Sequence, residues 1–137
     1  MALKYKKIIK TKNGDVLRFL RKKELKKFNE IYFSEILPKS IKAWKKNTNM
    51  EQNIIVPCGN IKLALIKDLD NKKTKIIFLG KNYDYGIYKI PKNIWYGFKC
   101  IGKEKALIIN CISKIHKEKN NSINELEIYF KRKVFFS

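Results

Sequence analysis

A tryptophan stands among lysines in the stretch SIKAWKKN, residues 40–47, and these residue types suit two kinds of chemistry. The ring of Trp44 can stack on a base while Lys42, Lys45 and Lys46 hold phosphates, as in proteins that bind single-stranded nucleic acid. Alternatively, the stretch is one wall of a binding pocket, and its lysines face a small anionic ligand. The rest of the chain has to discriminate between these two interpretations.

The net charge of the chain is large, but the identity and distribution of the basic residues make it weak evidence for nucleic-acid binding. The 137 residues include 32 Lys and Arg against 12 Asp and Glu, a formal net charge of +20, which is typical of chains with anionic partners. Arginine occurs only at Arg18, Arg21 and Arg132, although bidentate recognition of guanine or phosphate favours arginine. The lysines are spread along the whole chain, and abundant Lys, Ile and Asn is what an AT-rich genome encodes. We keep a basic nucleic-acid-binding protein as an alternative only.

Residues for metal or nucleophilic catalysis are scarce. His116 is the only histidine, whereas a metal site on facing strands of a β protein needs two or three histidines and a carboxylate. One histidine also gives no Ser-His-Asp or Cys-His arrangement, so we expect a surface or capping role for His116. Cys58, Cys100 and Cys111 are odd in number and lack CxxC spacing, which favours small core residues in a reducing compartment. We expect no metal and no other cofactor.

Short apolar runs separated by turn residues predict a β protein. About eight runs at about ten-residue spacing are typical of an all-β sandwich or barrel. The run at 61–67 alternates, so Ile61, Leu63 and Leu65 should share one face, and the continuous run at 106–112 should be buried on both faces. The runs are 31–37, 40–44, 52–56, 61–67, 74–80, 86–90, 94–98 and 106–112.

Two segments depart from the strand pattern. Between residues 15 and 29, four apolar residues recur near helical spacing among lysines and glutamates, which predicts a short helix near residues 22–28. The tail NELEIYFKRKVFFS is rich in aromatic residues, which favours docking on the barrel as a final strand or a short helix. Tyr96 is one candidate partner for these aromatic residues.

Several segments in order carry a resemblance to a known family. They are Asn13-Gly14-Asp15-Val16, EIYFSEILPKSIKAWKKN (30–47), VPCGNIKLALIKD (56–68) and YKIPKNIWYGFKCIGKEKALIINC (88–111). Together they resemble the dTDP-4-dehydrorhamnose 3,5-epimerase family of small jelly-roll cupins, in a short, divergent member. The most specific piece is IPKNIWYGF (90–98). The resemblance covers about residues 13–118 and implies an all-β double-stranded β-helix, the jelly-roll or cupin barrel, as a single domain over residues 1–137.

The resemblance also implies which positions carry the site. With Lys42 in the place of a family arginine, the proton-abstracting histidine falls at Lys45. The histidine before Gly-Phe becomes Tyr96, and the general-acid tyrosine falls near Asn110. Arg18 and Lys42 are the expected contacts of a pyrophosphate. Because the family's base and acid are both replaced, a catalytically inactive cupin that binds a sugar nucleotide or a protein partner stays open, as does a 3,4-ketoisomerase-type enzyme.

Other groups can supply the chemistry of an epimerase. Epimerisation beside a ketone needs a base for the α-proton, a stabiliser for the enolate oxygen, and an acid on the other face. Lys45 is the expected base if burial and the charges of Lys42 and Lys46 lower its pKa. Tyr96 is the expected acid, and Asn110 is expected to donate a hydrogen bond to the oxyanion.

Strand geometry sets a condition on this site. Alternate residues of a strand face opposite ways, so Lys42 and Lys45 both face the barrel interior only if a bulge intervenes. Without a bulge, Lys45 faces inward together with Ile41 and Ala43. Trp44 then faces outward, where it packs against other parts of the protein or a second subunit.

The expected ligand is a nucleoside-diphosphate sugar, a dTDP-4-keto-6-deoxy sugar if the chain acts in surface-polysaccharide synthesis. Family members are usually homodimers that exchange an N-terminal strand, for which MALKYKKIIK is the candidate. No apolar stretch approaches the roughly 20 residues of a membrane span, and the first residues lack the apolar region of a signal peptide. We therefore expect a cytoplasmic protein without membrane contact.

Overall fold

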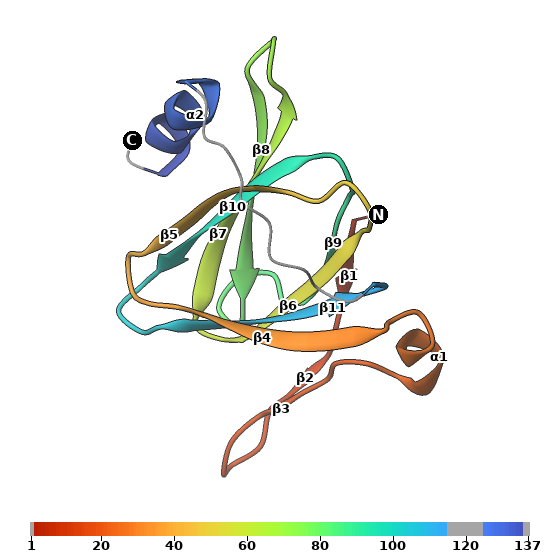
Figure 1. Cartoon of the computed structure of the whole chain (residues 1–137). Coiled ribbons are helices and arrows are strands. Elements are labelled where there is room, and N and C mark those ends of the chain that lie inside the picture. Colours follow the sequence, from red (N-terminus) through yellow and green to blue (C-terminus); the bar gives the residue numbers. More distant parts are fainter. Residues whose placement is uncertain (1, 115–124, 136–137) are drawn as a thin grey trace.

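Two antiparallel β-sheets packed face to face form most of the computed structural model, which describes residues 2–114 and 125–135 (Figure 1). The five-stranded sheet has the order β1-β9-β6-β11-β4, the four-stranded sheet has the order β5-β10-β7-β8, and β2 pairs with β3 in a small ribbon. The elements are β1 (Leu3–Tyr5), β2 (Ile8–Ile9), β3 (Val16–Leu17), α1 (Lys22–Leu25), β4 (Glu30–Ile36), β5 (Ile41–Lys46), β6 (Gln52–Cys58), β7 (Asn60–Asp68), β8 (Lys73–Gly80), β9 (Gly86–Ile90), β10 (Trp95–Ile101), β11 (Ala106–Ile112) and α2 (Glu125–Phe135).

The predicted strands are confirmed, because each apolar run lies within or largely overlaps a strand from β4 to β11. Ile61, Leu63 and Leu65 of β7 are fully buried in the core between the sheets, as the alternation predicted. β11 lies between β6 and β4, with Ile108 in the core. On its other face Cys111 is buried while Leu107 and Ile109 are half-buried, so the predicted burial on both faces is met only in part. The core therefore follows from the period-two pattern.

The core between the sheets is apolar along most of its length. Side chains from both sheets interdigitate there, which is how two packed sheets bury their inner faces. At the end where β6 and β10 begin, the inner faces carry polar side chains instead. The buried apolar members are Ile36, Ile54, Val56, Ile61, Leu63, Leu65, Leu79, Tyr88, Ile90, Tyr96, Phe98, Cys100, Ala106 and Ile108.

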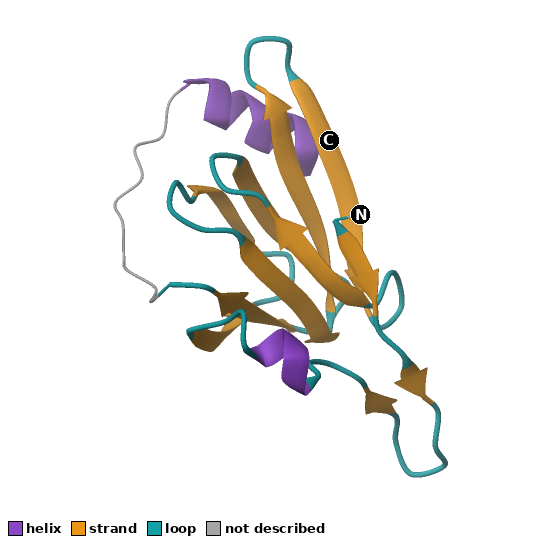
Figure 2. Ribbon diagram, turned by 90° about the vertical axis from the view of Figure 1, so that its right-hand side faces the viewer, coloured by secondary structure: helices purple, strands orange, loops and turns teal. Residues whose placement is uncertain are grey.

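The tail forms a helix, α2, that lies on the outer side of the four-stranded sheet (Figure 2). Phe130, Val134 and Phe135 are buried there in one cluster with Trp44, and the ring centroids of Trp44 and Phe135 are 5.5 Å apart. The prediction of a docked tail is confirmed. Tyr96, which was one candidate partner, does not pack against the tail, because it points into the core between the sheets.

Two lysines of the sheet fix the end of α2. The amine of Lys62 donates to the carbonyl oxygen of Val134 at 2.6 Å, and the amine of Lys99 donates to that of Phe135 at 3.0 Å. Carbonyl groups in the last turn of a helix lack partners within the helix and carry partial negative charge. The two ammonium groups therefore donate to carbonyl oxygens that have no partner within the helix, and their positive charge interacts favourably with the negative end of the helix dipole.

The predicted short helix is present as α1, and it contributes a buried ion pair. Glu24 lies 2.8 Å from the amine of Lys6, and both side chains are 8% exposed. Burial alone raises the pKa of Glu24, but the hydrogen bond and charge of Lys6 outweigh it, so the pKa falls below its ordinary value of 4.5. A carboxylate with a lowered pKa stabilises the fold above pH 4.5 and loses that contribution as the pH falls through the lowered pKa.

We expect Glu24→Gln to lower the free energy of unfolding at pH 7 by about 1–3 kcal/mol, because Lys6 is left buried without its counter-charge. The matched control is Glu35→Gln, which breaks an exposed pair with Lys105 and should change stability by less than about 1 kcal/mol. Urea unfolding at several pH values measures both. A Glu24→Gln deficit that does not shrink as the pH falls below 4.5 would contradict this account.

Candidate active site

A β-bulge in β5 brings two lysines to the same side of the sheet. Lys45 pairs with Tyr96 of β10 and Lys42 pairs with Phe98, so two residues of β5 lie opposite Gly97 alone. Directly paired residues project to the same face, and both Tyr96 and Phe98 belong to the core between the sheets. Lys42 and Lys45 therefore both lie on the inner face, because the extra residue resets the alternation.

The bulge sends Trp44 to the outer face. Trp44 is 3% exposed, and it packs with Ile41, Ala43 and α2 on the outside of the sheet. The expectation that Trp44 is a packing residue is confirmed, but Ile41 and Ala43 face outward with it, not inward with Lys45. The peptide bond between Ala43 and Trp44 is cis. A Cβ at Gly97 would lie 2.5 Å from that of Ala43, so only glycine fits opposite the bulge.

A chain of four polar side chains crosses the interior at this end. The amide nitrogen of Gln52 donates to the hydroxyl of Tyr96 at 2.7 Å. The amide nitrogen of Asn110 donates to the oxygen of Gln52 at 2.6 Å and to the hydroxyl of Tyr32 at 2.9 Å. Tyr96 comes from the four-stranded sheet and the other three come from the five-stranded sheet. The structure thus brings Lys45, Tyr96 and Asn110 to one end of the barrel.

The protonation states in this cluster suit proton transfer. Partial burial lowers the pKa of Lys45, although its side chain remains exposed, and the charge of Lys42 lowers it further. Burial raises the pKa of Tyr96 to about 12, with the hydrogen bond from Gln52 opposing the change. Burial also raises the pKa of Tyr32. An amine that loses its proton more easily thus lies beside a phenol that keeps its own.

The side chain of Asn110 holds its neighbours Gln52 and Tyr32 by hydrogen bonds. Its amide nitrogen already serves Gln52 and Tyr32, so donating to an oxyanion would mean giving up one of these hydrogen bonds. Its oxygen Oδ1 is buried without a hydrogen-bond partner, which costs free energy. The side chain is therefore oriented to hold Gln52 and Tyr32 at the expense of its own acceptor.

The two expected pyrophosphate contacts lie in different places. The amine of Lys42 donates to the hydroxyl of Ser34 at 3.1 Å and to the carbonyl oxygen of Glu35 at 2.7 Å. Both acceptors are uncharged, so the positive charge of Lys42 stays available to an anion. Arg18 is exposed, and its backbone carbonyl oxygen accepts a hydrogen bond from the hydroxyl of Tyr85. Because Tyr85 packs on the outer face of the five-stranded sheet, Arg18 is not brought to this site within the chain.

Comparison with known proteins reveals the family. Over 91% of this chain and 86% of the other, the structure is similar to a dTDP sugar isomerase from Desulfovibrio desulfuricans G20, with 32% identity and a TM-score of 0.78. The chain belongs to the family of dTDP-sugar epimerases and isomerases. The predicted jelly-roll cupin fold and the family resemblance are both confirmed.

More distant members of the dTDP-sugar epimerase and isomerase family share the fold. The TDP-quinovose 3,4-ketoisomerase of Campylobacter jejuni is 21% identical, with a TM-score of 0.64 over 84% of this chain and 85% of the other. The dTDP-4-dehydrorhamnose 3,5-epimerase of Bacillus anthracis str. Ames is 16% identical, with a TM-score of 0.66 over 84% and 73%. At these identities, the similarity concerns the fold alone.

One curated relative also matches. The chain is 28% identical over 83 residues to a probable low-salt glycan biosynthesis epimerase of Haloferax volcanii, which is 58% of this chain and 53% of that protein. The chain thus matches about half the length of this relative. No family model matches the chain.

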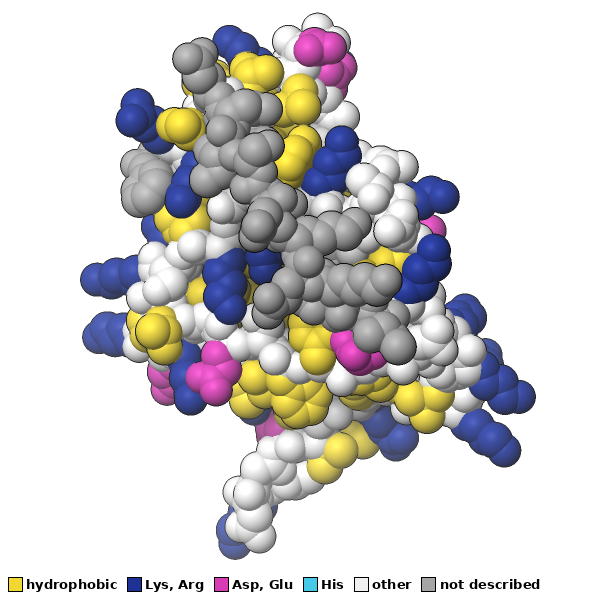
Figure 3. Space-filling view, viewed as in Figure 1, with side chains coloured by type: hydrophobic (Ala, Val, Ile, Leu, Met, Phe, Trp, Pro, Cys, Tyr) yellow, Lys and Arg dark blue, Asp and Glu magenta, His cyan; other side chains and the backbone are white. Residues whose placement is uncertain are grey.

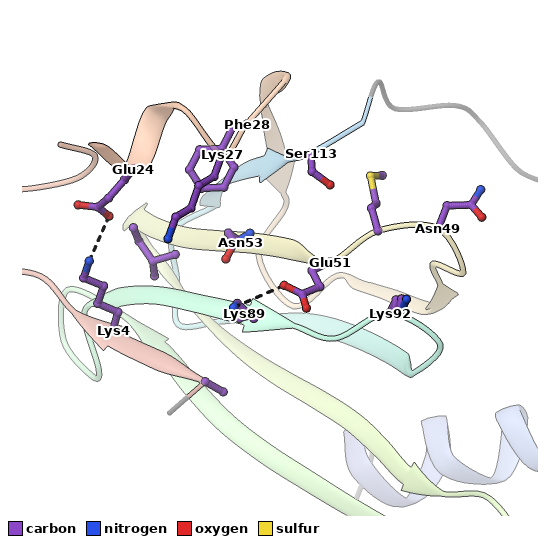
Figure 4. Close-up of a pocket in the computed structure, with 13 residues that line it drawn as sticks. Lys4, Glu24, Lys27, Phe28, Asn49, Glu51, Asn53, Lys89, Lys92 and Ser113 are labelled. Carbon is purple, nitrogen blue, oxygen red and sulfur yellow. Dashed lines mark ion pairs between the residues drawn. The ribbon is translucent and has the colours of Figure 1, made fainter. Parts of the chain in front are cut away.

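A cavity of about 430 Å³ lies elsewhere, between α1 and the outer face of the five-stranded sheet (Figure 4). Asn53 and Lys89 point into it, one position away from the inward-facing Gln52 and Ile90. Lys4 pairs with Glu24, and Lys89 pairs with Glu51. This cavity is therefore separate from the candidate site, which lies on the inner faces of the two sheets.

The surface and the remaining predicted features add little to the site. Lys and Arg side chains are scattered over the face in Figure 3 and do not form a single stripe. Within residues 2–114 and 125–135, no three His, Cys, Asp or Glu side chains gather to hold a metal ion. No helix in the described part of the chain has the length and apolar character needed to cross a membrane. His116 lies outside the described residues.

Two members of the cluster, Gln52 and Tyr32, were not among the site residues predicted from the sequence. A signal for Gln52 was present, because it shares strand parity with Ile54 and Val56, both of which face the core. A polar residue at an inward position marks a functional or hydrogen-bonded group. Tyr32 likewise shares parity with the fully buried Ile36.

Proposed function

We propose that this chain is an isomerase or epimerase of a nucleoside-diphosphate 4-keto sugar, of the dTDP-4-keto-6-deoxy type. The observation that carries the proposal is the pairing of Lys45 with Tyr96 on the inner face, where the pKa of the amine is lowered and that of the phenol is raised. Membership of the dTDP-sugar epimerase and isomerase family supports the ligand class. A glycan biosynthesis epimerase among the relatives supports a role in surface polysaccharides.

In the proposed reaction, the neutral amine of Lys45 removes a proton from the carbon beside the C4 ketone. The electron pair of that C–H bond forms a C=C bond, and the ketone oxygen becomes an enolate oxygen. Tyr96 keeps its proton at neutral pH and stabilises or protonates the enolate. Asn110 belongs to the site as the group that orients its neighbours, while Lys42 supplies positive charge for the pyrophosphate.

Subunit assembly and location are part of the proposal. The outer side of β4 exposes Ile31 at 40% and Phe33 at 65% on an edge strand, and an exposed apolar edge favours association. These residues support a homodimer, and a cytoplasmic location is part of the same proposal. β1 pairs with β9 of the same chain, so an exchanged N-terminal strand would replace this pairing with that of a second copy.

The test is proton exchange in heavy water with dTDP-4-keto-6-deoxyglucose. We expect deuterium to enter the sugar beside the ketone, observed by NMR, and dTDP to raise the melting temperature at moderate salt. A dTDP shift without exchange at high enzyme concentration would instead indicate a catalytically inactive sugar-nucleotide binder. Strongly salt-dependent binding to generic DNA without a dTDP shift would favour the nucleic-acid alternative.

A further inference from the structure

We propose that Tyr32 is a second catalytic residue, which delivers a proton to the sugar face opposite Lys45 and so makes the reaction an epimerisation. The inference rests on the proposed function and assigns a role to a residue outside the Lys45–Tyr96 pair. Lys45 and Tyr96 alone do not account for inversion. Lys45 and Tyr96 are neighbours on the same sheet, and groups side by side approach a flat enolate from one side, whereas inversion needs a donor on the other side.

Tyr32 has the required position. It lies on β4 of the five-stranded sheet, which faces the four-stranded sheet that carries Lys45. It shares strand parity with Ser34, which holds Lys42, and with the core residue Ile36, so its side chain is on the inner face. A sugar ring between the two sheets would therefore have Lys45 on one side and Tyr32 on the other.

Accessibility distinguishes Tyr32 from the rest of the polar chain. Gln52 is 3% exposed, Asn110 is 5% exposed and Tyr96 is 6% exposed, so these three side chains are buried beneath the solvent-accessible part of the site. Tyr32 is half-buried and Lys45 is exposed. A ligand that enters from solvent can reach Lys45 and Tyr32 while it rests on Tyr96.

The hydroxyl of Tyr32 is held for this role. The amide of Asn110 donates to it at 2.9 Å, and Asn110 leaves its own oxygen Oδ1 buried without a partner. The same amide donor also stabilises the phenolate that remains after proton delivery.

One proton passes from the sugar to Lys45 and another passes from Tyr32 to the sugar. Lys45 takes the α-proton and becomes an ammonium, while the C–H electron pair forms the enolate. The C=C pair then takes the proton of the Tyr32 hydroxyl from the opposite face, which restores the ketone and leaves a phenolate. The phenolate regains a proton from the ammonium of Lys45 through solvent, so the enzyme returns to its starting state.

The decisive experiment separates exchange from inversion in Tyr32→Phe. With dTDP-4-keto-6-deoxyglucose in heavy water, we expect Tyr32→Phe to keep deuterium exchange within about threefold of the wild type, because Lys45 can return a deuteron to the same face. Formation of the inverted sugar should fall by about 100-fold or more, since a general acid contributes about 10²–10⁴-fold. Tyr83→Phe, which removes an exposed hydroxyl at a loop, should change neither rate.

The possible outcomes are distinct. Inversion in Tyr32→Phe at the wild-type rate overturns the role of Tyr32 and leaves the proposed function standing. Wild-type protein that shows neither exchange nor inversion overturns the proposed function, and this inference with it. If Tyr32→Phe loses its dTDP thermal shift, Asn110→Val decides instead: it should reduce inversion more than exchange, and an equal loss of both would overturn the proposal.

Discussion

Lys45→Met should reduce exchange of the sugar protons with solvent by about 10²–10⁴-fold, the usual contribution of a general base. Methionine keeps the length of the side chain but has no amine to accept a proton. The position is exposed and lies on the inner face next to Tyr96, so the fold should survive the change. Heavy-water exchange with dTDP-4-keto-6-deoxyglucose, followed by NMR, measures the effect.

Lys46→Met is the matched control for this prediction. It removes the same charge one residue away, where the amine lies 5.6 Å from the ring centroid of Trp95. We expect exchange to change by less than about fivefold, because Lys46 pairs with Trp95 on the outer face of the sheet and its charge contributes only screened attraction of the anionic substrate. Equal losses in the two variants would show that Lys45 acts only through its charge.

The pH profile of the wild type tests the same role. A lysine base is active only when neutral, so kcat/KM for exchange should rise with pH and level off above the pKa of Lys45. Burial and the charge of Lys42 lower that pKa below its ordinary value of 10.5, so the rise should end below pH 10.5. Tyr96 has a pKa of about 12 and keeps its proton across this range. A rise that continues through pH 10.5 would contradict the lowered pKa.

Trp44→Ala should lower the free energy of unfolding by about 3–5 kcal/mol, the usual cost of truncating a buried large aromatic residue. Trp44 is 3% exposed, and its ring contacts that of Phe135 beneath α2. The truncation leaves a cavity between the sheet and the helix, so α2 should also lose protection against hydrogen exchange. Urea unfolding followed by circular dichroism measures the loss without depending on tryptophan fluorescence.

The control for this prediction is Tyr83→Ala, which truncates an aromatic side chain that is 53% exposed in the loop after β8. It should change the free energy of unfolding by about 0.5 kcal/mol or less, as is usual for surface positions. A Trp44→Ala loss below about 1 kcal/mol would mean that Trp44 contributes little to packing. It would also reopen the stacking role that the basic stretch around it suggested.

The strands were predictable because their signal is local. Alternation in β7 and the continuous apolar run of β11 follow directly from burial on one or both faces of a strand. The short helix near 22–28 and the docked tail were predictable for similar reasons, from spacing and aromatic content. The partner of the tail was not, since Trp44 lies far from α2 in the sequence and no local pattern links them.

The sequence by itself determined that the chain is a jelly-roll barrel with Lys45, Tyr96 and Asn110 as candidate site residues. Only the tertiary structure decided how they meet. The bulge opposite Gly97 adds one residue to β5 and resets the parity, which places Lys42 and Lys45 inside and Trp44 outside. The polar chain joins residues 44, 58 and 78 positions apart in the sequence. Such contacts depend on sheet packing and strand register, which a local pattern does not encode.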